Sequence, residues 1–256
     1  RDRLRSRGLG DVYKRQMDYG IVIEKIHQEL KAYWGKGKVA DYIPALAEVE
    51  PKRYGIAIET LDGHSFQVGD ADIRFSIQSI SKVFALAMVT RHLGDRIWKF
   101  VGREPSGNPF NSLVQLEYEH GIPRNPFINA GALVVTDRLM SLYEQPKDAI
   151  LQFVRSICGN DDIYYDKHIA RSEREHADRN MALGYLMKSF GNMENDVEDV
   201  VDVYCHQCAI AMSCKELTRA FLFLANHGVN PFNQEKILTV LSLIHISEPT
   251  RPEPIS

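Results

Sequence analysis

The sequence predicts an α+β fold, with a short antiparallel hairpin near the N-terminus and a large helical region after it. Apolar and polar residues alternate on both sides of Asp62-Gly63, a dipeptide typical of tight hairpin turns. After residue 76, apolar residues recur mainly at helical spacing and strand signals are sparse. The 256 residues are 44% hydrophobic and 25% charged, which is enough apolar material for one sizeable core.

The first expected element is a helix that begins near Met17 and stops at Gly35, a residue suited to helix C-termini. Its apolar residues recur at helical spacing and are Ile21, Ile23, Ile26, Leu30 and Tyr33. The hairpin follows, with antiparallel strands expected over residues 54–60 and 64–68. A two-stranded hairpin is marginally stable alone, so the sheet is expected to need further strands.

The helical region is expected to contain six helices, over residues 80–94, 129–143, 147–158, 180–190, 196–211 and 214–227. The last of them starts with a capping box, Ser213 with Glu216, and stops at Gly228. Residues 102–132 form a long irregular stretch. Loops of that length are usually functional or disordered, but its apolar residues predict that it is packed. These residues are Phe110, Leu113, Val114, Leu116 and Ile122.

Both ends read as foreign to the domain. Residues 1–16 are strongly basic and residues 242–256 are rich in proline without periodicity, and both resemble translated sequencing adapters. A disordered basic arm and a disordered tail are the alternative. The remaining residues, 17–241, are expected to form a single domain, with a helix-and-sheet part (17–75) and a mainly helical part (76–241). Because the further strands would have to follow residue 240, the domain is expected to be incomplete at its C-terminus.

Charge and cysteine content limit the class of partner. The net charge is −3, which argues against nucleic acid or an anionic membrane surface. No apolar run reaches the ~20 residues of a membrane span, and no secretory signal is visible. The four cysteines then indicate a reducing, cytoplasmic compartment. Cys205 and Cys208 have the spacing of half a metal site, but nothing completes four ligands, so no metal is expected.

One short motif predicts chemistry. Ser79 and Lys82 form the chain's single Ser-x-x-Lys sequence, and apolar residues follow without a break from Val83 to Val89. A serine hydroxyl attacks a carbonyl only after a base takes its proton. On a helix, residues three apart share a face, and burial lowers the pKa of a lysine so that it can be this base. The free N–H groups of the helix N-terminus would stabilise the oxyanion. The alternative is that Ser79 is only a helix N-cap.

Longer segments place this motif in a family. They are "GKVADYIPALA" (37–47), "FSIQSISKV" (75–83), "PSGNPFNSLVQLE" (105–117), "GIPRNPFINAGAL" (121–133), "RSEREHADRN" (171–180) and "LMKSFGN" (186–192). Together, and in this order, they resemble the serine-dependent glutaminases. The resemblance implies a β-lactamase/transpeptidase-like fold and hydrolysis of L-glutamine to L-glutamate and ammonia. It also implies no cofactor and a homo-oligomer, usually a tetramer.

The resemblance also assigns residues, position by position. It makes Ser79 the nucleophile and Lys82 the general base. The substrate-binding positions that it implies are Tyr42, Ser79, Asn129, Glu173, Asn180 and Tyr204. The chemistry agrees, because an anion suits the α-ammonium of glutamine and neutral donors suit its carboxylate.

Each of these residues also has a plain structural interpretation. Tyr42 would be a packing residue near a turn, Glu173 part of a solvated charge cluster, Asn129 and Asn180 helix caps, and Tyr204 a core aromatic. Two alternative functions stay open as well. One is a penicillin-recognising serine acylase or esterase, since Ser-x-x-Lys occurs in those enzymes, although their Ser-Asp-Asn and Lys-Thr-Gly companions are absent here. The other is a non-catalytic amino-acid-binding module.

The sequence departs from the family pattern at one place. Family members carry a second catalytic tyrosine in a Ser-Gly-x-Tyr context, and a Lys-Ser-Gly-Val segment whose backbone amide completes the oxyanion hole. Neither segment occurs in these 256 residues. The loss of one oxyanion donor typically costs ~10²–10³ in rate. The chain as written is therefore expected to be inactive or poorly folded.

Overall fold

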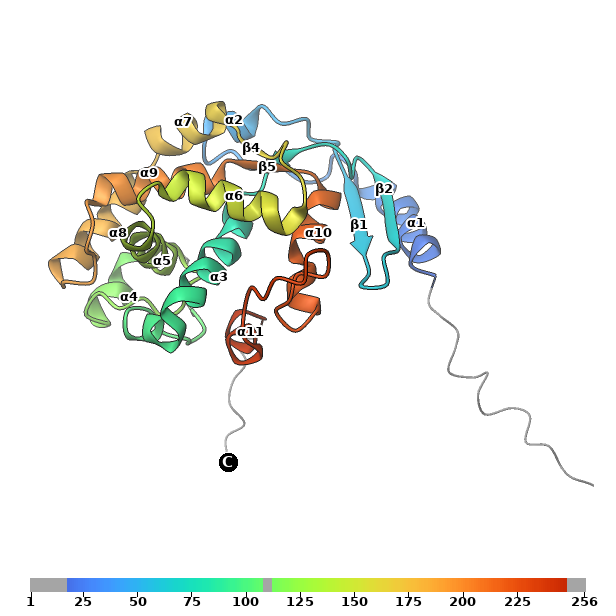
Figure 1. Ribbon diagram of the computed structural model, residues 1–256. Coiled ribbons are helices and arrows are strands. Elements are labelled where there is room, and N and C mark those ends of the chain that lie inside the picture. The colour runs from blue at the N-terminus through green and yellow to red at the C-terminus, as the bar shows by residue number, and fades with distance from the viewer. Residues whose placement is uncertain (1–17, 108–111, 248–256) are drawn as a thin grey trace, which may run out of the picture.

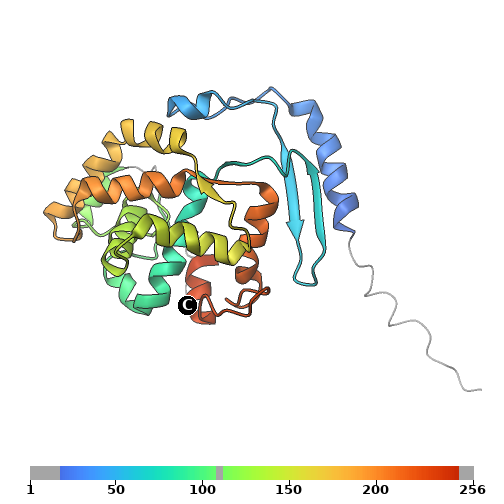
Figure 2. The same cartoon turned by 45° about the horizontal axis from the view of Figure 1, so that its top comes forward.

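The computed structural model describes residues 18–107 and 112–247 and, for residues 244–247, the backbone alone. A body of helices lies beside a two-stranded hairpin, and one helix covers the outer side of the hairpin (Figure 1). Figure 2 shows the same separation from a second direction. The predicted α+β architecture is confirmed in this part of the chain.

The N-terminal helix α1 (Tyr19–Leu30) begins after Asp18, whose side chain accepts a hydrogen bond from Ile21 N at 3.2 Å. A single 3-10 turn, η1 (Lys31–Tyr33), follows it. Gly35 has a φ of +77°, a backbone conformation that glycine adopts without steric cost. The helix was predicted to stop at Gly35, but α1 ends at Leu30 and the 3-10 turn at Tyr33.

The hairpin consists of β1 (Gly55–Glu59) and β2 (Ser65–Gly69). The two strands are antiparallel, in a register that places Gly55 opposite Gly69 and Glu59 opposite Ser65. The prediction from Asp62-Gly63 is therefore confirmed. Helix α1 packs on β2 and helix α10 (Cys214–Ala225) packs on β1, so the ribbon lies between two helices.

A second sheet was not predicted. Its strands are β3 (Phe75–Ser76), β4 (Tyr164–Tyr165) and β5 (Ile210–Met212), and β5 lies between the other two, antiparallel to both. Strands of two or three residues are too short to show alternation, so the sequence carried no signal for them. The sheet matters for the site, because it joins the segment just before Ser79 to the segment just after Cys208.

The remaining elements are α2 (Pro44–Ala47), η2 (Gln78–Ser81), α3 (Lys82–Leu93), η3 (Gly94–Lys99), α4 (Leu113–Tyr118), α5 (Asn129–Leu142), α6 (Pro146–Cys158), α7 (Lys167–Glu175), α8 (Asp178–Ser189), α9 (Val197–Cys208) and α11 (Val240–Ser247). Helix α7 was not predicted, and α9 ends three residues earlier than predicted because β5 follows it. Helix α11 includes residues 242–247, which the sequence reading had assigned to the foreign tail. The capping box of Ser213 and Glu216 on α10 is confirmed.

Helix α3 forms the centre of the core. Every residue from Phe84 to Thr90 is at most 4% exposed, so the helix is surrounded on all sides, as its unbroken apolar run predicted. It packs against α5 and α6, and α5 is buried from Ala130 to Leu139 in the same way. This packing fixes the first residue of α3, Lys82, beside the first residue of α5, Asn129.

The irregular stretch 102–132 is only partly packed. Leu116 is buried, but Leu113, Val114 and Ile122 are exposed, so that part of the prediction is wrong. Phe110 lies outside the described residues. A search of residues 18–107 and 112–247 finds no helix that is both long and apolar enough to cross a membrane.

Candidate active site

Ser79 does not lie on the α-helix that the sequence predicted. It belongs to the 3-10 turn η2, and α3 begins only at Lys82. A 3-10 turn has three residues per turn, so the backbone of Ser79 lies one turn before that of Lys82. The N-cap position of α3 is Ser81, whose hydroxyl donates to Gln78 O at 2.7 Å. The interpretation of Ser79 as the helix cap is therefore wrong, and its side chain is exposed.

The turn that carries Ser79 has an unusual backbone. Gln78 has a φ of +49°, a left-handed conformation that non-glycine residues rarely adopt and that often marks functional sites. Just before it, Ile77 N donates to Ile210 O at 2.9 Å, which anchors the turn to β5. The Gln78 side chain donates to Ser76 Oγ and accepts from the Tyr42 hydroxyl, both at 3.0 Å. Sequence reasoning missed Gln78, since its only signal was its position next to Ser79.

Lys82 is buried, with 3% of its surface exposed. Its Nζ donates to Phe127 O at 2.8 Å and to Asn129 Oδ1 at 3.0 Å. Burial lowers the pKa of Lys82 to about 8, while the neighbouring Cys208 thiol acts in the opposite direction. At pH 7 about a tenth of such a lysine is neutral, against less than a thousandth of an ordinary lysine. The side chain can therefore act as a base near neutral pH.

Tyr204 approaches from α9, which packs against η2. Its ring is buried, and its hydroxyl interacts with the side chains of Cys208 and Ser79. Burial raises the pKa of Tyr204 well above its usual value, so the phenol stays protonated. Tyr204 is thus a buried aromatic residue, as its plain interpretation held, and its polar end also reaches the serine.

Asn129 links Lys82 to α8. Its Oδ1 accepts from Lys82, and its Nδ2 donates to Asn180 Oδ1 at 3.2 Å. Neither asparagine caps its helix, because the N-cap positions of α5 and α8 are Ile128 and Ala177. Their interpretation as helix caps is therefore wrong.

Glu173, on α7, is 8% exposed, whereas its neighbours Arg171 and Glu175 are exposed. A solvated charge cluster does not describe it. Its carboxylate accepts from the Tyr42 hydroxyl at 3.5 Å and also interacts with Gln78. Burial raises the pKa of Glu173, and these hydrogen bonds partly offset the effect. Tyr42 is 61% exposed, so it lies at the rim of the site and does not pack in the core.

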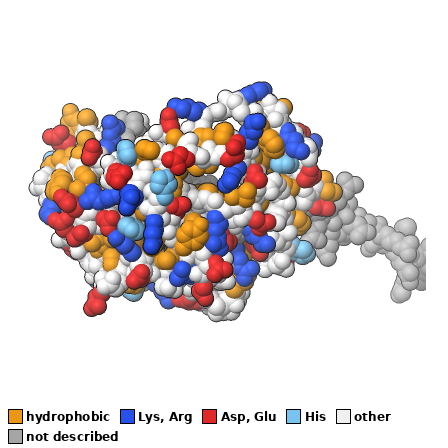
Figure 3. All heavy atoms as spheres, turned by 90° about the horizontal axis from the view of Figure 1, so that it is seen from above, with side chains coloured by type: hydrophobic (Ala, Val, Ile, Leu, Met, Phe, Trp, Pro, Cys, Tyr) orange, Lys and Arg blue, Asp and Glu red, His pale blue; other side chains and the backbone are white. Residues whose placement is uncertain are grey.

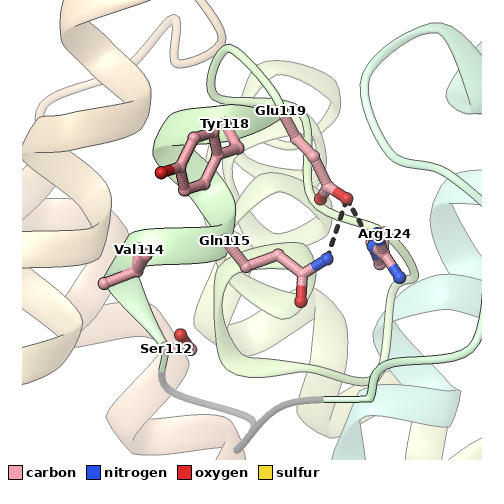
Figure 4. Close-up of a pocket in the computed structure, with 6 residues that line it drawn as sticks. All are labelled: Ser112, Val114, Gln115, Tyr118, Glu119 and Arg124. Carbon is pink, nitrogen blue, oxygen red and sulfur yellow. Dashed lines mark hydrogen bonds and ion pairs between the residues drawn. The ribbon is translucent and has the colours of Figure 1, made fainter.

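None of these residues lines either of two hollows on the described part of the chain. A groove of about 840 Å³ runs between η1, α2, β3 and α7, and Ser76 forms part of its wall. A pocket of about 400 Å³ lies over α4, where Glu119 accepts from Gln115 Nε2 at 3.0 Å and pairs with Arg124 (Figure 4). Within the described part of the chain no group of three or more His, Cys, Asp or Glu side chains is arranged to hold a metal ion.

The chain resembles proteins named as glutaminases. A family model described as Glutaminase matches residues 37–247. The glutaminase of Paraburkholderia phytofirmans is 55% identical over 231 residues, which cover 90% of this chain and 76% of the relative.

Solved structures give the same result. The structure titled "Probable glutaminase ybaS" superposes with a TM-score of 0.77 at 32% identity, over 87% of this chain and 74% of that one. The structure of Mglu in its native form superposes with a TM-score of 0.79 at 32% identity, over 87% of this chain. The superposed region covers 54% of Mglu, so the chain spans about half the length of that protein.

Proposed function

The chain belongs to the glutaminase family, enzymes that hydrolyse L-glutamine to L-glutamate and ammonia, and from this premise we propose that Ser79 is the nucleophile and Lys82 its base. The structural neighbours are glutaminases of the β-lactamase-like fold, which confirms the predicted fold. Family membership makes the protein a hydrolase that acts on a linear carboxamide. The assignment of individual residues comes from the sequence resemblance, and the geometry of the site supports it.

The reaction uses two displacements at one carbonyl carbon. Neutral Lys82 takes the proton of the Ser79 hydroxyl as the oxygen attacks the side-chain amide of glutamine. The C–N bond then breaks, the lysine returns the proton to the leaving nitrogen, and ammonia departs from a glutamyl ester. A water molecule attacks the ester with the same lysine as base, which releases glutamate and restores the serine. No metal or cofactor takes part in this scheme.

Substrate recognition follows from the charges around the serine. Free glutamine carries an α-ammonium, an α-carboxylate and a neutral amide. Glu173 is the buried carboxylate of the site and suits the ammonium, since charge-assisted hydrogen bonds are the stronger ones. The neutral donors Tyr42, Asn180 and Tyr204 suit the carboxylate, and Asn129 lies between Lys82 and Asn180.

The observation that carries this proposal is the environment of Lys82. Lys82 is buried and its two hydrogen-bond acceptors are neutral, so its charged form is costly. Buried lysines with a lowered pKa are found mainly at sites where the lysine takes part in a reaction. Among the described residues, the same small region holds an exposed serine, a buried carboxylate and two neutral amides. This set fits a zwitterionic amide better than a β-lactam, which has no α-ammonium in its reacting core.

The pH dependence of turnover tests the base. Because Lys82 acts only after losing its proton, kcat for L-glutamine is expected to rise about tenfold per pH unit below 8 and to level off above it. The measurement is ammonia release from pH 6 to 10 by the chain extended with a family C-terminus, which supplies the Ser-Gly-x-Tyr and Lys-Ser-Gly-Val segments. Every other turnover measurement uses the same extended chain. Circular dichroism at each pH is the control, since partial unfolding would also change the rate. A profile without a break between pH 7 and 9 would exclude Lys82 as the base.

Glu173 is tested by its neutral isostere. Glu173→Gln is expected to raise KM for L-glutamine by about 10- to 100-fold, because one charge-assisted hydrogen bond contributes about 1.5–3 kcal/mol. Glu175→Gln is the matched control, since Glu175 lies on the same helix and is exposed. If the two variants gave the same KM, Glu173 would not bind the ammonium.

The partner class is a small molecule. On the face seen in Figure 3, basic and acidic side chains alternate without a continuous field of one sign, which supports this choice over nucleic acid or an anionic membrane. The four cysteines are unpaired, in keeping with a reducing, cytoplasmic compartment. The homotetramer that the family resemblance implies completes the proposal, and analytical ultracentrifugation measures it.

A further inference from the structure

A buried asparagine shapes the turn that holds Lys82. Asn125 is 4% exposed and makes three hydrogen bonds through its amide. Its Oδ1 accepts from Phe127 N at 3.0 Å and Ile128 N at 3.1 Å, and its Nδ2 donates to Glu104 O at 2.9 Å. The network fixes which end of the amide is oxygen, since both backbone partners at that end are donors.

The turn then offers two acceptors to the lysine. Phe127 O and Asn129 Oδ1 lie 2.8 and 3.0 Å from Lys82 Nζ. A neutral amine has two N–H bonds and one electron pair. When two acceptors from the same turn take both hydrogens, the electron pair is left pointing in the remaining tetrahedral direction. The position of the turn therefore decides where the base can accept a proton.

We propose that Asn125 is a positioning residue for the general base, which it serves by holding the Phe127 carbonyl and the Asn129 amide against Lys82. The proposal rests on the role of Lys82 proposed above. Asn125 touches neither substrate nor the reacting atoms, and acts through the turn from Asn125 to Asn129.

The turn is also fastened to helix α5. A Cβ atom added to Gly131 would lie 1.9 Å from Asn125 O, so the first turn of α5 packs directly on the asparagine backbone. Any movement of Asn125 would therefore be transmitted to Asn129, at the start of the same helix. A loosened turn would move both acceptors together.

Other groups near Lys82 do not depend on this turn. From α9, the Cys208 thiol faces the lysine, and Tyr204 lies between Cys208 and Ser79. From α7, Glu173 acts on Cys208. Asn129, on α5, is neutral and is one of the two acceptors that move with the turn. A change at Asn125 leaves Cys208, Tyr204 and Glu173 in place, so its effect on Lys82 isolates the contribution of the turn.

The chain contains a matched control for this asparagine. Asn-Pro-Phe occurs three times, at 108–110, 125–127 and 230–232, and the first copy lies outside the described residues. In the third copy Asn230 is 1% exposed, its Oδ1 accepts from Phe232 N at 2.9 Å, and its Nδ2 donates to Ile157 O at 3.4 Å. This turn shares with that of Asn125 the bond from the phenylalanine N–H to the asparagine Oδ1, but it lacks the second backbone donor, and neither hydrogen bond of Lys82 goes to it.

The experiment compares Asn125→Ala with Asn230→Ala. Either change leaves unsatisfied backbone groups around a small polar cavity, which water fills. At position 125 that water would hydrate Lys82 and favour its charged form, so the pKa of Lys82 is expected to rise by about one unit. NMR titration of the chain with ¹³Cε-labelled lysine measures this pKa without glutamine. This rise in pKa corresponds to about a tenfold lower kcat at pH 7, and the acidic limb of the kcat–pH profile is expected to move to higher pH by the same amount.

Asn230→Ala is expected to lose a similar amount of thermal stability and to leave the Lys82 signal unchanged. Asn125→Ser keeps one oxygen acceptor on the turn, so its Lys82 pKa should lie between those of wild type and Asn125→Ala. This variant keeps the inference testable if Asn125→Ala does not fold. A wild-type Lys82 pKa in Asn125→Ala or Asn125→Ser, with stability lowered as in Asn230→Ala, would overturn the inference. Absence of turnover by the extended wild-type chain would contradict the proposed function instead, since the NMR measurement does not require catalysis.

Discussion

Ser79→Ala is expected to lower ammonia release from L-glutamine by on the order of 10⁶-fold, the scale seen when a serine hydrolase loses its nucleophile. Without the hydroxyl no glutamyl ester forms, and Lys82 has no proton to take. Because the Ser79 side chain is exposed and caps no helix, the variant should unfold at the wild-type temperature. The measurements are ammonia release, intact mass for the trapped ester, and thermal denaturation.

Ser189→Ala is the control, since Ser189 is also exposed and its hydroxyl makes a local bond to Leu186 O. It should keep wild-type turnover. If Ser79→Ala retained more than a tenth of the activity, the nucleophile would lie elsewhere. Acylation of wild-type Ser79 by benzylpenicillin, with no turnover of glutamine, would favour the acylase alternative. Glutamine binding without any turnover, unchanged in Ser79→Ala, would favour the amino-acid-binding module.

Lys82→Met is expected to lower kcat by about 10²–10⁴-fold, the usual contribution of a general base. Methionine matches the length of the lysine stem and suits the buried site, so shape changes little. Lys188→Met, at an exposed position, is the control and should keep wild-type kcat. Wild-type activity in Lys82→Met would show that another group activates the serine.

The same variant separates activity from stability. The pKa of Lys82 is about 8 when folded, against 10.5 for an ordinary lysine, so the folded state binds fewer protons between these pH values. The contribution of Lys82 to the free energy of unfolding therefore rises with pH between about 8 and 10.5. Below pH 8 the protonated lysine lowers the free energy of unfolding by about 3 kcal/mol. Methionine removes this cost but leaves two acceptors unbonded, at about 1–3 kcal/mol each. At pH 7 the free energy of unfolding is therefore expected to stay close to that of wild type, while kcat falls.

Local patterns were sufficient for most elements of the fold. The hairpin around Asp62-Gly63, the central α3 and the capping box of α10 depend on residues adjacent in sequence or one helical turn apart, and all three were predicted. The second sheet was not, because β3, β4 and β5 are too short for a periodic signal and form only when the helices bring them together. Helix α7 was missed as well, since seven of its nine residues are polar or charged.

The sequence motifs identified the residues of the candidate site, but they did not predict how these residues are arranged in space. Sequence resemblance selected Tyr42 together with Glu173 and Tyr204, which lie more than a hundred residues further along the chain, but it could not distinguish buried from exposed side chains. Gln78 gave no signal, because its left-handed backbone results from the anchoring of Ile77 on β5. Asn125 lies inside a family motif, yet its effect on Lys82 depends on the close contact with Gly131.

Residue identity and short-range periodicity were enough to identify the family, the chemical types of the side chains and the central position of α3. Tertiary packing was needed to reveal that Ser79 lies on a 3-10 turn outside α3. It also decided that Lys82 is enclosed by α5 and α9, and which acceptors hold it. The physical reason is that a pKa depends on desolvation and on neighbours from several elements. Those quantities exist only once the chain has packed.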